Sequence, residues 1–459
     1  MKQLWIVVMM AFGVVLASSP LVALTVDTIP FDGAASVSHL VVDSQGDLWF
    51  TAAILRLMHI REGQLVCVCD SDDYTAGVTN GSFALEVAPD GTIYINGFRY
   101  QYRLDTGLSE TGIAGPSTSE HYCLLSAHLD ADERMFSIYY LSYHTSDVNP
   151  QFDVYELYED ASYARRTTVR DISSVIAVSA SQFWIADVYD RPHYHPPPSL
   201  VRLNLDAGTQ EESHPIDFDK FRACALRARD SEGRLWISGE DIVTFDGEEL
   251  SVYAPADTWI REYYRGLSLA GDGTVWVVLD AYTGAGIARL NGNERRVFNK
   301  EDGLLAALSP YSPVIDYDGN VWILSSDMTS GWDKCLGISM ISDGGWPPMR
   351  LILEKVETPE TVAVTAQVIN NGPVVGVDVY IAIELNGQLL FYPTWEPVPF
   401  PNQVNLRPGH NQTATIVEMP RESVPPGTYT VYGCMTGRGT QKLIGPIGRK
   451  FEAVVVEVE

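Results

Sequence analysis

The sequence predicts an all-β protein that consists of a seven-bladed β-propeller followed by an immunoglobulin-like β-sandwich. A short motif, in which a turn precedes an aromatic residue among aliphatic ones, recurs along residues 43–324. After residue 349 this motif stops, and short alternating apolar runs take over. The chain has 459 residues, 46% of them hydrophobic, which is enough to build packed cores in two or three domains.

The repeated motif is clearest in "DYDGNVWI" (316–323) and "DSEGRLWI" (230–237). Aspartate and glycine tolerate the backbone of a tight hairpin turn, and the aromatic residue belongs to the strand that follows. Successive aromatics lie 40 to 52 residues apart, which is the length of one propeller blade. The seven aromatic positions are Trp49, Tyr94, Phe136, Trp184, Trp236, Trp276 and Trp322.

Each repeat has room for four strands, except the last. The unit around Trp322 offers three, near 312–317, 320–325 and 335–342, before "SDGGWPPM" breaks the pattern. The segment "LTVDTIPF" (24–31) is a spare strand ahead of the first blade. We therefore expect it to pair into the seventh blade and close a propeller over residues 25–346, because closure removes exposed sheet edges.

The "DxxGxhW" units, with "FNKEDGLLAAL" (298–308) leading into the last, resemble the propeller repeats of bacterial two-component sensor ectodomains and of the streptogramin lyase superfamily. The lyase resemblance implies catalysis by a histidine base, a nearby glutamate and Mg²⁺. None of the nine histidines matches the lyase catalytic motif, and the residues after Trp49 and Trp322 lack the acid that lyase blades tend to carry. The resemblance therefore indicates architecture, and no catalytic residue is carried over from it.

Residues 347–459 contain seven alternating runs, among them "TVAVTAQVIN" and "GTYTVYGCM", separated by turns such as Asn386-Gly387. This pattern predicts an immunoglobulin-like sandwich. "VINNGPVVGVDVYIAI" and "PPGTYTVYGCM" resemble the accessory sandwich modules of exported bacterial proteins, which space or dock other domains.

The N-terminus and the charge indicate where the protein acts. Residues 1–24 contain one lysine, an apolar run and small residues, which predicts a secretory signal peptide; an uncleaved anchor is the alternative. We expect a secreted, periplasmic or cell-surface protein with no later membrane insertion. The net charge of −28 argues against nucleic-acid binding. The six cysteines form no disulfide framework, and most of them are expected to be buried.

The candidate binding site is the propeller mouth on the face opposite the Asp/Gly turns. Loops at the ends of the innermost strands surround a central channel there, and ligands gather at such a mouth. The residues that enter first strands or leave second strands on this face are His39, Asn96, His121, Tyr139, Asp187, Arg222, Glu240, Arg265, Asp280 and Tyr311.

Other patterns suggest chemistry only weakly. In "YDRPHYHPPPSL" (189–200), His193 and His195 could bind a metal ion with a nearby aspartate, but the three prolines favour an extended contact loop. "DYDGN" lacks the remaining ligands of a calcium loop. We therefore predict no resident metal, no cofactor and no catalytic residue.

Three functions remain open from the sequence. The leading hypothesis is a non-catalytic exported protein whose propeller mouth binds a protein, a peptide or a glycan. The first alternative is a metal-assisted lyase or hydrolase on the same scaffold, and the second is a purely architectural cell-surface protein. The oligomeric state is not predicted.

Overall fold

The computed structural model describes most of the two predicted regions, and its regular elements are almost all strands. Two short 3-10 turns, η2 (Lys300–Asp302) and η3 (Arg421–Ser423), accompany them. No helix among the residues that the structure describes is long and apolar enough to cross a bilayer. The described residues are 25–34, 37–43, 45–52, 56–61, 64–69, 84–88, 93–96, 100–104, 110–114, 124–129, 135–140, 151–157, 163–170, 172–179, 182–187, 199–216, 225–239, 241–254, 264–279, 286–292, 294–304, 313–327, 334–342, 345–446 and 449–458.

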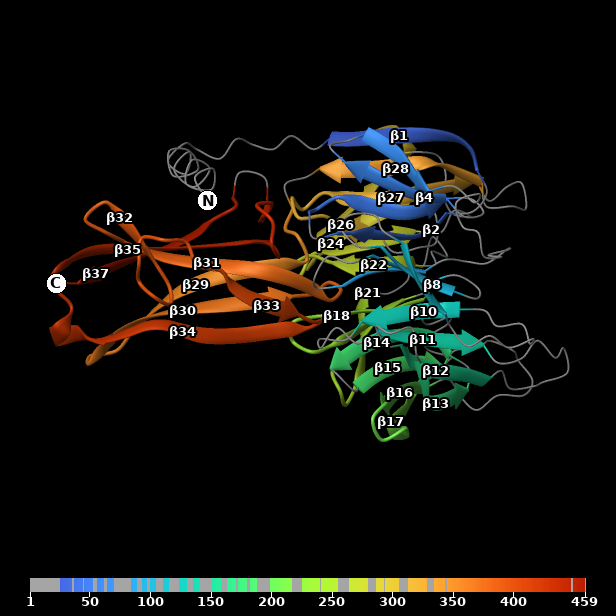
Figure 1. Cartoon of the computed structure of the whole chain (residues 1–459), viewed down its shortest axis with the longest axis horizontal. Helices are drawn as coiled ribbons and strands as arrows, with labels where there is room; N and C mark the ends of the chain where they lie inside the picture. The colour runs from blue at the N-terminus through green and yellow to red at the C-terminus, as the bar shows by residue number, and fades with distance from the viewer. Residues whose placement is uncertain are drawn as a thin grey trace, which may run out of the picture.

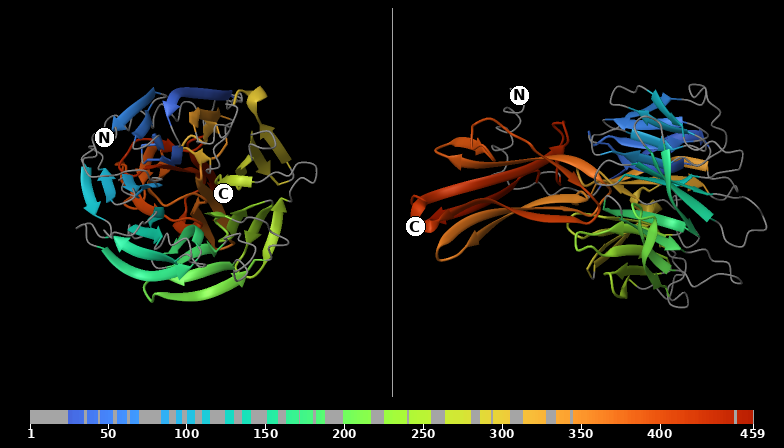
Figure 2. Two further views of the ribbon diagram at one scale, coloured as in Figure 1. Left: turned by 90° about the vertical axis from the view of Figure 1, so that its right-hand side faces the viewer. Right: turned by 60° about the horizontal axis from the view of Figure 1, so that its bottom comes forward.

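Seven antiparallel four-stranded sheets form a ring, so the predicted all-β propeller is confirmed (Figure 2, left). In the first six sheets the strands follow chain order from the inside outward. The first three sheets consist of β2 (Val37–Val42), β3 (Leu48–Ala52), β4 (Arg56–Arg61) and β5 (Gln64–Cys69); β6 (Ala84–Val87), β7 (Ile93–Asn96), β8 (Tyr100–Leu104) and β9 (Glu110–Ala114); and β10 (Leu124–Leu129), β11 (Met135–Tyr140), β12 (Gln151–Leu157) and β13 (Tyr163–Arg170).

The next three sheets repeat the arrangement. They consist of β14 (Ile172–Ser179), β15 (Gln182–Asp187), β16 (Ser199–Asn204) and β17 (Thr209–Pro215); β18 (Ala225–Arg229), β19 (Leu235–Ser238), β20 (Ile242–Phe245) and β21 (Leu250–Ala254); and β22 (Tyr264–Leu269), β23 (Val275–Leu279), β24 (Gly286–Asn291) and β25 (Glu294–Phe298).

The seventh sheet joins the two ends of the propeller sequence. It contains β26 (Val314–Ile315), β27 (Val321–Asp327) and β28 (Lys334–Ser342), and its fourth strand is β1 (Thr25–Ala34). β1 runs antiparallel to β28, with Thr25 opposite Ser342 and Ile29 opposite Ile338. A strand from the start of the described chain therefore completes the last blade, which is the arrangement expected for "LTVDTIPF".

Hydrogen bonds explain the aspartate that three of the repeats have six residues before the tryptophan. In the first blade, Asp43 Oδ1 accepts hydrogen bonds from the backbone N–H of Gln45 (2.8 Å) and Asp47 (3.0 Å), and Asp43 Oδ2 accepts one from Trp49 Nε1 (2.8 Å). Asp230 and Asp316 make the same three kinds of bond in the fifth and seventh blades. The carboxylate thus caps the turn and fixes the indole at the same time.

The repeated tryptophans also hold neighbouring blades together. Trp236 packs in one buried cluster with Leu267 and Val277 of the next blade, and Trp322 packs with Leu40 and Phe50 of the first blade. Trp184 and Trp276 likewise contact the blades that follow them. All four indoles are at most 9% exposed, so the aromatic position is a wedge between blades rather than a ligand contact.

The C-terminal region consists of two sheets that pack face to face around one apolar core. Of the paired strands described, three form one sheet, and six form the other. The first sheet contains β29 (Met349–Glu357), β30 (Thr361–Asn370) and β34 (His410–Pro420), and the second contains β31 (Val375–Leu385), β32 (Gln388–Phe391), β33 (Asn402–Leu406), β35 (Gly427–Gly437), β36 (Leu443–Ile444) and β37 (Glu452–Val458). We refer to this region as the sandwich; its relation to the immunoglobulin fold and the boundary at residue 346 stay predictions.

The sandwich stands on one end of the propeller, and its other end, with the C-terminus, points away (Figures 1 and 2). The contact is made by the Asp/Gly turns between the first and second strands of the blades. Asn371, which is 4% exposed, bridges two of these turns: its Nδ2 donates to Ala270 O (2.8 Å), and its Oδ1 accepts from Ser231 N (2.7 Å). Gly271 N donates to Pro347 O at 2.7 Å.

The turn of the seventh blade penetrates furthest into the sandwich. Tyr317 is 3% exposed and belongs to the same buried cluster as the sandwich core. Its carbonyl oxygen accepts hydrogen bonds from Gly445 N (3.0 Å) and Lys450 Nζ (3.3 Å). Burial, followed by the negative charge of Asp43, raises the pKa of the Tyr317 hydroxyl. Backbone and core contacts therefore couple the two regions.

Candidate functional site

The two ends of the propeller strands have different surroundings. The turns that follow β2, β18, β22 and β26 face the sandwich, since Gly46, Ser231, Gly271 and Tyr317 all approach it. The starts of the first strands and the ends of the second strands therefore lie on the opposite face. That face is the predicted mouth, and it is turned toward the viewer in Figure 2 (left), with the sandwich behind the ring.

Five of the predicted mouth residues lie within described strands. His39 is in β2 and Arg265 in β22, while Asn96 and Asp187 are the last residues of β7 and β15. Tyr139 is the second-last residue of β11. Each of the five positions lies in the part of its strand that is remote from the turn. The remaining mouth residues His121, Arg222, Glu240, Asp280 and Tyr311, and the weak metal candidates His193 and His195, lie outside the described residues.

A break in pairing register recurs on the mouth side of the innermost strands. His39 lies within the break in β2, and Arg265 lies within the break in β22. A bulge bends a strand and re-aims its side chains, and bulges are common next to binding sites. Across the five blades concerned, the breaks fall between Ser38 and Leu40, Leu124 and Ser126, Ile172 and Ser174, Leu226 and Ala228, and Tyr264 and Leu267.

Arg227 is a further residue of this kind that the sequence did not single out. It lies in the register break of β18, and its Nε donates a hydrogen bond to Ser238 Oγ at 3.1 Å. Ser238 ends β19 on the mouth side and is 2% exposed. Two residues along the same strand, Arg229 reaches the opposite way and donates to Pro408 O of the sandwich. The two arginines lie on the same strand, and they differ in that Arg227 lies in the register break. The sequence does not reveal this break.

One described cluster has the composition of a metal site, but the repeat explains it. Ligand atoms of Asp43, Asp47 and His59 lie within 4.8 Å of one another. Both oxygens of Asp43 already accept hydrogen bonds in the arrangement that Asp230 and Asp316 share without a histidine. Burial raises the pKa of Asp43, while the hydrogen bond from Trp49 opposes that rise. The cluster lies at the turn end of the blade, away from the mouth.

His59 completes this cluster through an aromatic contact. Its ring stacks on Trp49 with centroids 4.1 Å apart, and its Nε2 lies 3.2 Å from Asp47 Oδ2. Because Asp43 already accepts hydrogen bonds within the turn, this cluster offers a metal ion the Asp47 carboxylate and the His59 imidazole. Protein sites for zinc or calcium use more ligands than these two.

An ionic contact secures the junction next to this turn. The Asp318 carboxylate pairs with Lys442 (2.9 Å) and with Lys450, both from the sandwich. Burial alone would raise the pKa of Asp318, but the two lysines outweigh it and hold the pKa below its ordinary value. Burial lowers the pKa of Lys450, and Asp318 opposes that shift. Charge pairing thus adds to the backbone contacts of the same turn.

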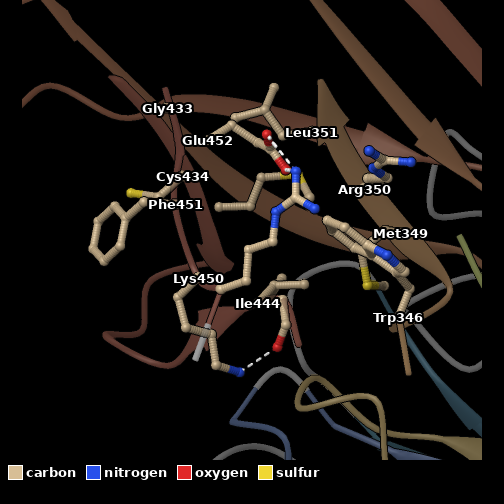
Figure 3. Close-up of a pocket in the computed structure, with 13 residues that line it drawn as sticks. Trp346, Met349, Arg350, Leu351, Gly433, Cys434, Ile444, Lys450, Phe451 and Glu452 are labelled. Carbon is tan, nitrogen blue, oxygen red and sulfur yellow. Dashed lines mark hydrogen bonds and ion pairs between the residues drawn. The ribbon is translucent and has the colours of Figure 1, made fainter. Parts of the chain in front are cut away.

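A shallow pocket opens in the sandwich beside the junction (Figure 3). It is small, with a volume of about 10 Å³, and it is open to solvent. Trp346, Arg350, Arg449 and Lys450 line it together with the apolar ends of β29 and β35. The Cys434 thiol, which is free, borders the pocket, and burial raises its pKa to about 12. At neutral pH this thiol is therefore protonated and a poor nucleophile.

Comparisons with known proteins agree on the propeller. No family model and no curated protein sequence matches the chain. Among solved structures, a streptogramin B lyase aligns with 71% of this chain and 99% of its own, at 14% identity and a TM-score of 0.48. The extracellular domain of a hybrid two-component system from B. thetaiotaomicron aligns with 94% of this chain and 57% of its own, at 12% identity and a TM-score of 0.48.

Both kinds of propeller named from the sequence are thus among the matching structures. A fungal alcohol oxidase bound to copper also aligns, with 94% of this chain and 98% of its own, at 10% identity and a TM-score of 0.48. Proteins of such different activity share this level of likeness, so the likeness concerns architecture and says nothing about chemistry.

Proposed function

We propose that the protein is an exported, non-catalytic binding protein whose propeller mouth takes a protein, peptide or glycan ligand. The sandwich would hold the propeller by its other face. The apolar N-terminal segment supports export, and the alternation of acids, histidine and arginines at the mouth supports a polar ligand.

The observation that carries this proposal is the occupation of one propeller face by the sandwich. Asn371, Pro347 and Gly445 bond to turns of the fifth, sixth and seventh blades. A ligand therefore has the opposite face available. The register breaks at His39, Arg227 and Arg265 support the same face, because bulges re-aim side chains near binding sites.

The test is a binding screen of the full chain against glycan and peptide arrays, followed by titration of the hits. We expect Arg265→Ala and Asp187→Asn to weaken a true mouth ligand roughly tenfold or more, the effect of losing one charged hydrogen bond. Arg296→Ala is the matched control, since Arg296 lies exposed on the outer strand β25 and should leave affinity unchanged.

A hit that both mouth variants bind as tightly as the unchanged protein would contradict the proposal. So would chemical turnover of a hit that the same variants abolish, which would instead favour an enzyme. Thermal unfolding of each variant, measured alongside, separates loss of binding from loss of folding.

A further inference from the structure

The pocket beside the junction, called here the Trp346 pocket, has a feature that the propeller function does not use. It is defined by Trp346, Arg350, Arg449 and Glu452, together with the ends of β29 and β35. The Arg350 guanidinium lies 4.2 Å from the centroid of the Trp346 ring, and the Arg449 guanidinium lies 5.1 Å from it. Figure 3 shows Trp346 and Arg350 next to each other among the residues that line the pocket. Two cationic groups thus share one indole.

The two arginines differ in their partners. Arg449 pairs with Glu452 at 3.2 Å. Among the described residues, Arg350 makes no ion pair, and its buried Nε has no hydrogen-bond partner. An unmade hydrogen bond on a buried charged group is unfavourable, so such groups are nearly always paired. Arg350 is therefore a partly desolvated cation with no counterion among the described residues.

The absence of an ion pair at Arg350 among the described residues contrasts with the acidic composition of the protein. The protein has 59 acidic and 31 basic residues, so carboxylates are abundant as internal partners. Lys450, the third cation of the pocket, is already held by Asp318. Stacking on Trp346 leaves the guanidinium edge of Arg350 as the part that can bond, and that edge matches the two oxygens of a carboxylate.

The space limits what can enter. The pocket has a volume of only about 10 Å³ and opens to solvent, so the group that enters is small. The Arg449 side chain is 55% exposed and can move to bond the same group. Trp346 and Phe451 are the aromatic residues that line the pocket.

We propose that the Trp346 pocket is a carboxylate-binding subsite, in which Arg350 forms a bidentate contact and Arg449 a second one. The carboxylate belongs either to a free small acid or to the uronate unit of an acidic sugar. This subsite lies in the sandwich and is separate from the mouth. It would give the protein a second contact with an acidic ligand or matrix.

The test is a ligand-observed NMR titration of the full chain with sodium acetate, sodium glucuronate and glucose at constant ionic strength. We expect roughly millimolar binding of the two carboxylates and no binding of glucose, as suits one charged contact. Equal affinity for acetate and glucuronate assigns a bare acid as the ligand. Tighter binding of glucuronate assigns the acidic sugar.

Three variants decide whether Arg350 is responsible. Arg350→Met should abolish binding, and Arg350→Lys should weaken it roughly tenfold, because lysine keeps the charge but lacks the planar fork. Arg296→Lys is the matched control, since the Arg296 guanidinium also lies over an aromatic ring, 4.8 Å from the centroid of Phe298, outside the pocket. It should change nothing.

The absence of carboxylate binding to the unchanged protein would overturn the proposal. Undiminished binding by a folded Arg350→Lys or Arg350→Met variant would overturn it as well. Either result would leave Arg350 as a purely structural partner of Trp346. The mouth variant Arg265→Ala should bind glucuronate normally in the pocket, so failure here and failure at the mouth are distinguishable.

Discussion

The two faces of the propeller differ in what their loops do. On the turn face, short turns built by Asp43, Asp230 and Asp316 are rigid, repeated and docked on the sandwich. On the mouth face, the innermost strands break register, and the predicted polar residues follow no repeat. The repeated part of each blade thus builds the scaffold and the junction with the sandwich, and the part that varies is the one for which we propose recognition.

The largest effect on stability is expected from substitutions at two turn glycines that have nearly the same backbone conformation. Gly319 (φ 81°) and Gly273 (φ 85°) both have the left-handed conformation that favours glycine. A Cβ on Gly319 would lie 1.9 Å from Gly345 O of the linker, while one on Gly273 meets nothing within 4 Å. We expect Gly319→Ala to lower the free energy of unfolding by about 3–5 kcal/mol, from overpacking and backbone strain together.

The Gly273→Ala variant is the matched control and should cost only about 1–2 kcal/mol, from backbone strain alone. Calorimetric unfolding of the full chain measures both. Equal losses in the two variants would mean that the turn of the seventh blade does not dock as described.

The next largest effect on stability is expected at Asn371, which bridges the turns of the fifth and sixth blades. Asn371→Leu removes the bonds to Ala270 O and Ser231 N; Ala270 O keeps the hydrogen bond from Gly273 N, but the Ser231 N–H loses this partner. We expect a loss of about 2–4 kcal/mol in stability, and a separate unfolding transition for each region as their coupling weakens. Asn411→Ala, at an exposed position of β34, is the control and should cost less than about 0.5 kcal/mol. A single unaltered transition in Asn371→Leu would count against a coupled junction.

A smaller effect depends on pH. The pKa of Asp318 is held below its ordinary value of 3.8, so its ion pairs stabilise the folded state above that value. The contribution is lost as the pH falls through the lowered pKa. At pH 7 we expect Asp318→Asn to cost about 2 kcal/mol, a difference that should shrink as the pH falls through the lowered pKa of Asp318. Denaturant titrations of both proteins at several pH values give this difference directly, and a constant difference across the range would refute it.

The sequence predicted the parts of the fold that rest on local chemistry. The spacing of Asp316, Gly319 and Trp322 predicted a turn followed by a strand, because one carboxylate caps the turn and bonds the indole. The same pattern could not predict which turns dock. Asn371 lies 140 residues from Ser231, and no local signal connects them. Arg227 was missed for a similar reason, since a register break depends on pairing with β19 rather than on composition.

The candidate mouth was predicted from topology alone. The order of strands within a blade fixes which loops share a face, so the positions of His39, Asn96 and Asp187 at one end could be deduced. Their interactions could not be deduced, because strand order fixes the end of the blade at which a residue lies but not the contacts that its side chain makes there. The Trp346 pocket was also not predicted, since Arg350 and Arg449 come from distant parts of the sandwich.

The most direct test of the coupled junction is amide hydrogen exchange in the full chain. Gly271 N, Ser231 N and Gly445 N donate hydrogen bonds across the junction to Pro347, Asn371 and Tyr317. We predict that these amides exchange as slowly as those of the sandwich core, and far more slowly than Glu248 N and Glu249 N in the exposed hairpin after β20. Exchange of the three junction amides at the rate of that hairpin would contradict a sandwich docked on the turn face, and with it the assignment of the opposite face to binding.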